Sequence, residues 1–389
     1  MKILIYSQHF WPENFRINDV AEELSKKHII YVISAWPNYN IVNKKKVFKY
    51  GFEKYKNINI IRVPTIKRYK NRYYNIIFNY LSFIIGSLFI KNKRFQKIKF
   101  DAVISYATSP IYQAIPAIIY SKRNKIPFFL WVQDLWPNVL KDLDILNNTF
   151  FLKILNSLTN YLYKKSDFIL AQSPKIRNIL KKKYKNTFLV YNPSNIKRFK
   201  PFKILKNKTK KIIFAGNIGK AQALEKLIYY GKLIKKEKIP IKFEIIGDGS
   251  NKLNLQKIIK NNNLKNIIIF KSYMNSKDLE KSLMNASGLL VSLGKGEALS
   301  VTIPAKFQTY ISYGKPIFSF SDNIIADIIK KNGIGFVLKK NNSKKIIYQF
   351  LKMNIKDRYL LMKKCKNLYL NYFEIQKNKK ELEKLLKKN

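Results

Sequence analysis

The stretch KIIFAGNIGKAQALEKLIYYGKLIKK, residues 211–236, decides the fold of the second half of the chain. Its apolar run at Lys211–Ala215 has the length and β-branched content of a strand. The chain then passes through the loop Gly216-Asn-Ile-Gly219 into a helical pattern from about Ala221 to Lys236. A strand, a glycine loop and a helix in this order predict one βα unit of a parallel sheet.

The same alternation of short apolar runs and helical patterns continues on both sides of this unit. Before it we expect strands at Ile3–Ser7, Ile29–Ser34, Ile58–Val63, Ala102–Tyr106, Phe128–Val132, Phe168–Ala171 and Thr187–Tyr191. After it we expect strands at Ile241–Ile246, Asn266–Phe270, Gly288–Ser292, Lys315–Phe320 and Gly335–Leu338. Short runs of this kind also occur as buried helix segments, but their length and composition favour strands. The sequence therefore predicts an α/β protein with two parallel sheets.

A length of 389 residues favours two domains, and a polar stretch at residues 206–210 separates the two sets of strands. We expect a first Rossmann-like domain at residues 1–200 and a second at 201–370. The Lys-rich segment 371–389 has a helical pattern, and by analogy with two-domain folds of this kind we expect it to cross back to the first domain.

The composition excludes several classes of protein. The single cysteine, Cys365, leaves no pair for an intrachain disulfide, and with only His9 and His28 a histidine-rich metal site is not expected. The N-terminal apolar run is too short for a signal peptide, so we expect a cytoplasmic protein. A formal net charge of +53 favours an anionic neighbour, most simply the inner face of the plasma membrane.

The segment Tyr73–Ile90 is the strongest membrane candidate because it contains no charged residue and basic residues follow it. Asn75 and Asn79 weaken a spanning helix. Three alternatives remain open: a helix buried against the sheet, an amphipathic helix lying in the membrane interface, and a span.

Two stretches of the second half could bind a phosphorylated ligand. In Gly216-Asn-Ile-Gly219-Lys220 the glycines allow close backbone approach, the helix N-terminus offers free N–H groups, and the lysine neutralises charge. In residues 302–316, TIPAKFQTYISYGKP, we expect one helix on which Thr302 and Lys306 share a face. Lys306 could then meet a phosphate, with Gln308 or Thr309 on a ribose. The alternatives are an ordinary glycine turn and solvated polar residues.

Two loops of the first half, QHFWPE at residues 8–13 and VQDLWP at 132–137, follow predicted strands and should open onto one edge of the sheet. Their Trp11 and Trp136 could stack on a sugar or an isoprenoid, although tryptophan is more often part of a core. Glu13 and Asp134 could act as acid or base, although solvated loop carboxylates are commoner.

Four motifs in order, SQHFWPEN, WVQDLWPNVL, FAGNIGKAQAL and TIPAKFQTYISYGKP, resemble family 4 glycosyltransferases with the GT-B fold over about residues 1–340. They look closest to the branch of N-acetylfucosaminyltransferase-like enzymes of O-antigen and capsule assembly. The resemblance implies two facing domains with a central cleft, a UDP-sugar bound mainly by the second domain and a lipid-linked acceptor bound by the first. It also implies a retaining transfer that requires no metal or other cofactor.

The loops and the resemblance together give the candidate site. The donor-binding candidates are Gly216, Asn217, Gly219, Lys220, Gly247, Tyr273, Pro304, Lys306, Gln308 and Thr309. The acceptor-binding candidates are Gln8, Phe10, Trp11, Pro12, Asn14 and Trp136. The candidate catalytic residues are Lys220, Lys306, Asp134 and Gln133.

This chain departs from the broad family at its usual glutamates and arginine. The two glutamate positions are Val301 and Thr309, Glu297 lies outside the spacing, and the arginine after the loop glycine is Asn217. The resembling branch shares these changes, which points to a subfamily. Lys220, Lys306 and backbone N–H groups would then stabilise the leaving diphosphate.

Two other functions compete with a transferase. A nucleotide-sugar epimerase such as a UDP-N-acetylhexosamine 2-epimerase can share the fold, and the glycine loop alone does not separate the two. Nucleic-acid binding is suggested only by the charge, because the sequence contains no zinc finger, aromatic ribonucleoprotein motif or basic arm.

Overall fold

The computed structural model describes residues 1–37, 51–67, 73–90, 93–195, 199, 209–272, 274–320 and 322–388. The chain divides into two compact units. Unit 1 consists of residues 1–195 and 374–389, and unit 2 of residues 196–373. The predicted linker at residues 206–210 lies mostly outside the described residues. The assignment of acceptor binding to residues 1–200 and of donor binding to residues 201–370 stays a prediction.

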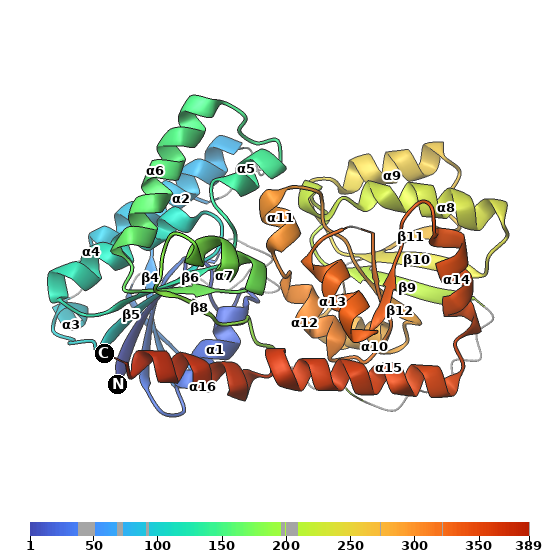
Figure 1. The fold of residues 1–389 in the computed structure, drawn as a ribbon. Helices are drawn as coiled ribbons and strands as arrows, with labels where there is room; N and C mark the ends of the chain where they lie inside the picture. The colour runs from blue at the N-terminus through green and yellow to red at the C-terminus, as the bar shows by residue number, and fades with distance from the viewer. Residues whose placement is uncertain are drawn as a thin grey trace. The chain divides into compact units, whose positions relative to one another are not determined.

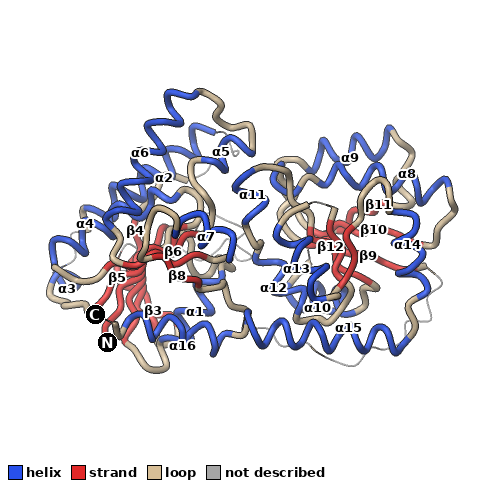
Figure 2. The backbone as a smooth tube through the Cα atoms, in the orientation of Figure 1, coloured by secondary structure: helices blue, strands red, loops and turns tan. Residues whose placement is uncertain are grey.

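Unit 1 is built on an eight-stranded sheet with the order β3-β4-β2-β1-β5-β6-β7-β8 (Figures 1 and 2). Its strands are β1 (Lys2–Tyr6), β2 (Ile29–Ala35), β3 (Gly51–Tyr55), β4 (Ile58–Val63), β5 (Ala102–Ala107), β6 (Phe128–Val132), β7 (Phe168–Ala171) and β8 (Thr187–Leu189). All neighbouring strands run parallel except β3, which pairs antiparallel with β4.

The seven strands predicted in this part of the chain are confirmed, and β3 was missed. The sequence of β3, GFEKY, has two charged residues and no continuous apolar run. As an edge strand it is only half-buried, so its sequence did not need to be apolar on both faces.

Helices cover both faces of this sheet. They are α1 (Arg16–Leu24), α2 (Tyr73–Leu88), α3 (Lys93–Gln96), the 3-10 helix η1 (Ile111–Ala114), α4 (Ile115–Asn124), α5 (Asn138–Asp142), α6 (Thr149–Lys165), α7 (Pro174–Lys181) and α16 (Ile375–Leu386). Apolar side chains of the inner strands, such as Ile5, Ile104 and Trp131, form the core with side chains of α1 and α16.

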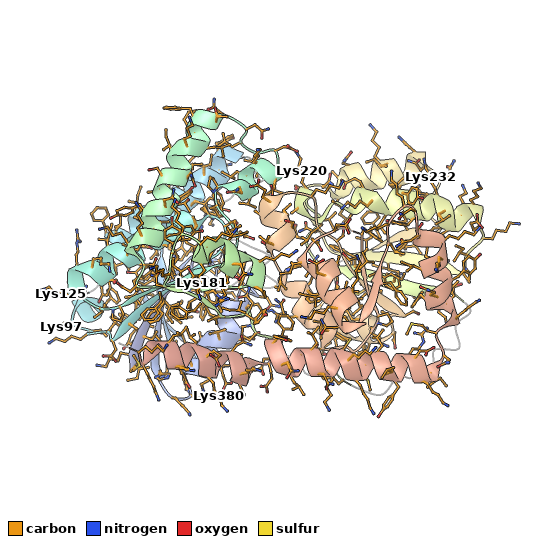
Figure 3. The ribbon with its side chains drawn as sticks, in the orientation of Figure 1. Lys97, Lys125, Lys181, Lys220, Lys232 and Lys380 are labelled. Atoms are coloured by element: carbon orange, nitrogen blue, oxygen red, sulfur yellow. The ribbon has the colours of Figure 1, made fainter. Side chains whose placement is uncertain are left out.

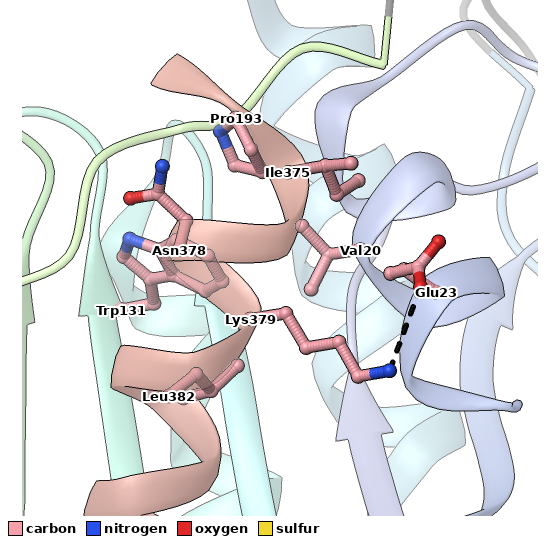
Figure 4. A pocket seen from close by; sticks show the side chains of 8 residues that line it. All are labelled: Val20, Glu23, Trp131, Pro193, Ile375, Asn378, Lys379 and Leu382. Atoms are coloured by element: carbon pink, nitrogen blue, oxygen red, sulfur yellow. Dashed lines mark hydrogen bonds and ion pairs between the residues drawn. The ribbon is translucent and has the colours of Figure 1, made fainter. Parts of the chain in front are cut away.

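Helix α16 completes this core although 178 residues of unit 2 precede it. Its Leu382 is buried in the core of unit 1. Lys379 Nζ lies 3.5 Å from a carboxylate oxygen of Glu23 on α1 (Figure 4), and His28 Nε2 lies 3.1 Å from Glu383. The pocket beside Lys379 and Glu23 has a volume of about 10 Å³, roughly the space of one water molecule and too small for a small-molecule site.

Unit 2 contains a six-stranded parallel sheet with the order β11-β10-β9-β12-β13-β14. Its strands are β9 (Lys210–Ala215), β10 (Ile241–Ile246), β11 (Ile268–Lys271), β12 (Gly288–Val291), β13 (Ile317–Ser319) and β14 (Gly335–Val337). All six were predicted, to within one or two residues at most ends. The α/β class with two largely parallel sheets is therefore confirmed.

The helices of unit 2 are η2 (Lys220–Gln222), η3 (Leu224–Lys226), α8 (Leu227–Lys236), α9 (Lys252–Asn261), α10 (Ser276–Met284), α11 (Glu297–Val301), α12 (Ala305–Ile311), α13 (Ile324–Asn332), α14 (Ser343–Lys352), α15 (Ile355–Leu368) and the π-helix η4 (Tyr369–Phe373). Side chains of β9, β10, α8 and α9 form the core of this unit, with Phe214, Phe243 and Leu255 almost fully buried.

The lysines that dominate the charge project from the surface of both units, as the labelled examples in Figure 3 show. Of the helices in the described part of the chain, none combines the length and the apolarity that a membrane span requires. The spanning alternative for residues 73–90 is therefore not supported, because α2 has only 16 residues.

Candidate functional site

The glycine loop, residues 216–219, follows β9 and is held against the loop that follows β10. Gly216 N donates to Ile246 O at 2.9 Å, and Ile218 N donates to Asp248 O at 2.8 Å. Both loops lie at the carboxyl ends of neighbouring parallel strands, which is where open sheets of this kind bind ligands. The predicted donor residues Gly216 and Gly247 therefore lie side by side.

A side chain would be strained at both glycines, and at Gly247 it would also collide with backbone. Gly247 has a φ of +142°, and a Cβ there would lie 2.1 Å from Gly216 O. Gly216 has a φ of +138°, and a Cβ there would lie 3.1 Å from Lys306 Nζ. Glycine at these two positions thus permits both an unusual backbone conformation and the close approach of two loops and a lysine.

The helix predicted from Ala221 begins later, at Leu227, because two 3-10 turns, η2 and η3, come first. Ala223 between them adopts a left-handed conformation with a φ of 44°, which interrupts the α-helix. Gly219 N donates to Gln222 Oε1 at 3.0 Å. The N–H of Gly219 is therefore already bonded within the loop. The sequence had suggested free N–H donors at this helix start, and Gly219 does not supply one.

Lys306 brings a positive charge to the glycine loop. Its Nζ is shielded from solvent and has no hydrogen-bond partner within the described ranges, although the stem of the side chain is partly exposed. The Nζ lies 3.6 Å from the centre of the Phe214 ring, a cation–π contact. Burial lowers the pKa of Lys306 to about 7. A buried ammonium without an acceptor beside an open glycine backbone is suited to receive an anion.

The expectation that Thr302 and Lys306 lie on one helix is wrong. Helix α11 ends at Val301, residues 302–304 are not helical, and α12 starts at Ala305. Pro304 ends this break with a φ of −70° and an extended ψ of 143°, so it precedes the helix instead of occupying its first turn. Thr302 Oγ1 bonds back to Ala298 O at 2.9 Å, on the other helix.

Gln308 and Thr309 both bond to their own helix. Gln308 is fully buried, and with its amide oriented to suit its neighbours its Nε2 donates to Pro304 O at 2.9 Å and to Ala305 O at 2.8 Å. Thr309 Oγ1 lies 3.4 Å from Ala305 O. Gln308 thus secures the first turn of α12, and the ribose contact suggested for it and for Thr309 stays a prediction.

Tyr310 is a residue of this site that the sequence did not point to. Its buried hydroxyl accepts a hydrogen bond from Ala215 N at 2.7 Å and donates to Ala215 O at 3.2 Å. Strand β12 pairs with β9 only at Ile212 and Ile213, so the N–H and C=O groups of Ala215 are not bonded to β12. The Tyr310 hydroxyl bonds to both of these groups instead. Tyr310 thereby fixes the end of β9 from which the glycine loop starts.

The remaining donor candidates are less constrained. Asn217 and Lys220 are exposed (Figure 3 labels Lys220). The Asn217 side chain lies close to the α-carbons of Gly219 and Gly249. Tyr273 lies outside the described residues.

The carboxyl edge of the unit 1 sheet is lined by buried side-chain amides. Gln8, which follows β1, donates from its backbone N to Gln113 Oε1 and from its Nε2 to Asn79 Oδ1, both at 2.9 Å. Gln113 lies in η1 and Asn79 in α2. Gln8 is only 1% exposed, so it holds these elements together more than it faces solvent.

Gln133, Asp134 and Trp136 follow β6 at the same edge. Gln133 Oε1 accepts a hydrogen bond from Asn192 Nδ2 at 2.6 Å, while its buried Nε2 has no partner in the described part of the chain. Ser109 Oγ donates to Asp134 Oδ2 at 2.9 Å and accepts from Trp136 Nε1 at 3.2 Å. The structure thus joins Asp134 and Trp136 through Ser109, while Gln133 bonds separately to Asn192.

The first loop divides between surface and core. Trp11 is half-buried and stacks on Tyr55 with ring centres 4.4 Å apart. Pro12 is half-buried and Asn14 is exposed. Phe10 is fully buried in the hydrophobic core of unit 1, which favours a structural role, and the acceptor contact suggested for it stays a prediction.

Glu13, considered above as an acid or base, is 2% exposed and lies 2.8 Å from His9 Nδ1. Arg62, also buried, bonds to Glu53 at 2.9 Å and to the backbone carbonyl of Trp11. Among the residues that the structure describes, no three His, Cys, Asp or Glu side chains gather as metal ligands.

Comparison with known proteins shows what these two units resemble. Residues 196–369 match the family model of the group 1 glycosyl transferases. The WcaI protein of Escherichia coli (strain K12), named for a glycosyl transferase role in colanic acid biosynthesis, is 28% identical over 110 residues. That match spans 28% of this chain and only about a quarter, 26%, of WcaI.

Solved structures extend the likeness over the whole chain. Sucrose-phosphate synthase from Thermosynechococcus elongatus superposes with a TM-score of 0.75 at 10% identity, over 100% of this chain and 98% of that protein. HepE of Anabaena in complex with UDP gives 0.67 at 11% identity over 100% of both chains. TarM of S. aureus, solved with UDP, gives 0.57 at 15% identity over 73% and 55%. Residues 196–369 thus match the group 1 glycosyl transferase domain, and the chain as a whole has the GT-B fold of these solved structures.

Proposed function

We propose that this protein is a retaining glycosyltransferase that moves a sugar from a UDP-sugar to a lipid-linked saccharide in bacterial surface polysaccharide assembly. One observation supports the assignment of a donor site: the buried Lys306 Nζ lies beside the exposed backbone of Gly216. The UDP complexes of HepE and TarM, which have the same fold, support the choice of nucleotide. The name of WcaI and the resemblance to the O-antigen and capsule branch support the kind of product, and the resemblance alone supports an N-acetylated or deoxy-hexosamine as the sugar.

In this mechanism the bond between the anomeric carbon and the diphosphate oxygen breaks while the acceptor oxygen bonds to the same face of that carbon. The acceptor's hydroxyl proton passes to the leaving diphosphate. Lys306 and Lys220 stabilise the charge that grows on the diphosphate, and this stabilisation is stronger where water is excluded. Gln133 and Asp134 contact the sugar and the acceptor in this proposal.

Binding of the leaving nucleotide tests the donor site directly. Calorimetry and thermal shift against UDP, GDP, ADP and CDP should show binding of UDP and a higher melting temperature, because a ligand that binds only the folded state stabilises it. Lys306→Ala should lose this binding. Lys232→Ala, an exposed lysine on α8, should keep it. No binding of any nucleotide by folded protein would refute the donor-site assignment.

Dependence on an acceptor separates the transferase from a nucleotide-sugar epimerase. A transferase transfers the sugar of a UDP-sugar only when a lipid-linked saccharide is added. An epimerase of the same fold would change the sugar or release UDP without any acceptor. Product analysis by mass spectrometry with and without an extracted lipid-linked acceptor therefore decides between the two.

A further inference from the structure

Two helices of unit 1 expose rows of large apolar side chains. On α2, Tyr74, Ile77, Phe78, Leu81 and Ile85 are each between 46% and 56% exposed, and their spacing places them on one face of the helix. On the opposite face Asn79 and Phe83 are fully buried. Helix α2 is therefore anchored in the unit on one side and apolar toward solvent on the other.

Helix α6 presents a second row of this kind. Phe150, Phe151, Ile154 and Tyr161 are between 49% and 65% exposed. Both α2 and α6 contact η1 and α4, and Figure 1 shows α2, α4 and α6 in one part of unit 1. The two rows are thus parts of one region, which we call the docking face. Apolar surface concentrated in this way marks an interaction site more often than a chance distribution.

The charge on α2, on its flanking sequence and on α6 has one sign. The sequence contains no acidic residue between Glu53 and Asp101, and it is rich in Lys and Arg on both sides of α2. Helix α6 carries Lys153, Lys164 and Lys165 and no acidic residue. An apolar helix face flanked by basic residues is complementary to an anionic lipid surface, which takes apolar side chains below its headgroups and attracts cations at them.

The docking face is also joined to the predicted acceptor loop. From the buried side of α2, Asn79 Oδ1 accepts the hydrogen bond of Gln8 Nε2 at 2.9 Å. From α6, the Leu155 carbonyl accepts a hydrogen bond from Tyr112 OH at 3.1 Å, and the next residue, Gln113, binds Gln8 N. Helix α2 is therefore connected directly to the loop that starts at Gln8, and α6 is connected to it through η1.

We propose that the exposed faces of α2 and α6 together dock unit 1 on an anionic membrane, with both helices lying in the plane of the interface. The purpose of this docking rests on the proposed function, because a lipid-linked acceptor is held at the membrane surface on which unit 1 docks. The surface itself needs neither donor nor acceptor. Docking holds the loop at residues 8–13 next to the headgroups, where the saccharide of such an acceptor is located.

Flotation of the full-length protein with lipid vesicles tests the surface. The docking variant carries Ile77→Ser, Leu81→Ser, Phe150→Ser and Ile154→Ser, all at exposed positions. Wild-type protein should float with vesicles of phosphatidylglycerol and phosphatidylcholine, and the docking variant's partition coefficient should fall at least about tenfold, since each buried apolar group contributes to membrane binding. Binding should weaken in 1 M salt, which shortens electrostatic range to about 3 Å.

A matched control carries four serine substitutions at exposed apolar residues of unit 2. Leu253, Ile355, Tyr359 and Leu360 are 80%, 59%, 51% and 53% exposed. This control should partition within about twofold of wild type, and circular dichroism and melting should show both variants folded. An equal loss in the control, undiminished flotation of the docking variant, or wild-type preference for neutral vesicles would overturn the proposal.

Two further outcomes separate the alternatives. If the wild type forms a dimer without lipid and the docking variant sediments as a monomer, the face is an interface between two copies and the proposal is wrong. If the wild type floats with anionic vesicles but binds no nucleotide in calorimetry, the docking face stands and the proposed transferase function fails. UDP affinity of the docking variant should equal that of the wild type.

Discussion

The carboxyl edges of the two sheets differ in the chemistry that they present. In unit 2 the edge is made of glycines with positive φ, Gly216 and Gly247, and of the buried ammonium of Lys306. In unit 1 it is made mainly of amides, among them Gln8 and Gln133, with the carboxylate of Asp134 beside them. Backbone and a cation suit a diphosphate, whereas amides and a carboxylate suit the hydroxyl groups of a sugar. The same architecture thus offers an anion site on one sheet and a hydrogen-bonding site without a cation from these residues on the other.

The largest effect should come from closing the contact between the two loops of unit 2. Gly247→Ala places a Cβ 2.1 Å from Gly216 O and forces alanine to a φ of +142°. We expect the free energy of unfolding of unit 2 to fall by about 3 kcal/mol or more, and UDP binding to be lost. Urea unfolding followed by circular dichroism measures this. Tryptophan fluorescence should report unchanged stability of unit 1, which contains all four tryptophans.

Gly51→Ala is the matched control for that substitution. Gly51 also has a positive φ, +122°, but a Cβ there meets nothing within 4 Å. It should cost only the backbone strain, about 1–2 kcal/mol, and leave UDP binding intact. Equal destabilisation by both substitutions would show that strain, and not the collision of the two loops, determines the effect.

Replacing Lys306 should separate binding from stability. Lys306→Met removes the charge but keeps an apolar stem against Phe214. We expect about 100-fold weaker UDP binding by calorimetry, since loss of one partner of a buried charge pair costs about 2–5 kcal/mol. The unliganded protein should melt at the same or a higher temperature, because a buried unpaired ammonium is removed. Unchanged UDP affinity would remove Lys306 from the donor site.

The pH dependence follows from the lowered pKa of Lys306, about 7 in the folded protein against 10.5 as the ordinary value. Between these values the unfolded chain binds more protons than the folded one, so the lysine's contribution to the stability of the unliganded protein rises as the pH increases from about 7 to 10.5. UDP affinity should change in the opposite direction and fall about tenfold between pH 7 and 8.5, because the anion needs the protonated form. Lys306→Met should abolish both trends.

A smaller effect is expected from Tyr310→Phe. The substitution removes the two hydrogen bonds to the backbone of Ala215 and should lower the stability of unit 2 by about 1–2 kcal/mol. UDP affinity should fall about fivefold, because the loop loses its fixed starting point. The control is Tyr229→Phe. Tyr229 lies on α8, and its hydroxyl makes an exposed hydrogen bond to Lys340 O. A stability loss without any change in UDP affinity would limit Tyr310 to a structural role.

An effect of similar size is expected in unit 1. Gln133→Ala removes the amide whose Nε2 is buried without a partner in the described residues and leaves Asn192 Nδ2 without its acceptor. We expect the KM for the acceptor to rise about three- to tenfold, the value of one or two neutral hydrogen bonds. UDP affinity should not change. A loss of UDP binding would contradict the assignment of this edge to the acceptor.

The sequence was sufficient for the parts of this fold that depend on local pattern. Buried parallel strands such as β1 and β6 are continuous apolar runs, and the glycines of residues 216–219 mark their loop by type alone. The exposed edge strand β3 has no such run and was missed. The break between α11 and α12 was missed as well, because Pro304 is compatible with both a helix start and an extended residue.

The site itself was predictable only in part, because several contacts join residues far apart in the chain. Tyr310 and Ala215 are separated by 95 positions, and no local pattern marks their hydrogen bonds. The burial of Phe10 depends likewise on neighbours from several strands. The role of Gln222 is local, but it became visible only once Gly219 was seen to donate to it. Sequence patterns thus gave candidate residues, and tertiary packing decided which of them are structural.

The position of α16 has a consequence for the order in which this protein acquires its structure during synthesis. Leu382, Leu385 and Leu386 are part of the core of unit 1, but they leave the ribosome after the whole of unit 2. Unit 2 is a continuous stretch of chain and can fold as soon as it emerges, whereas unit 1 must wait with part of its core uncovered. The half that is translated first is therefore the half that is completed last, and during this interval the apolar surface that α16 covers stays exposed.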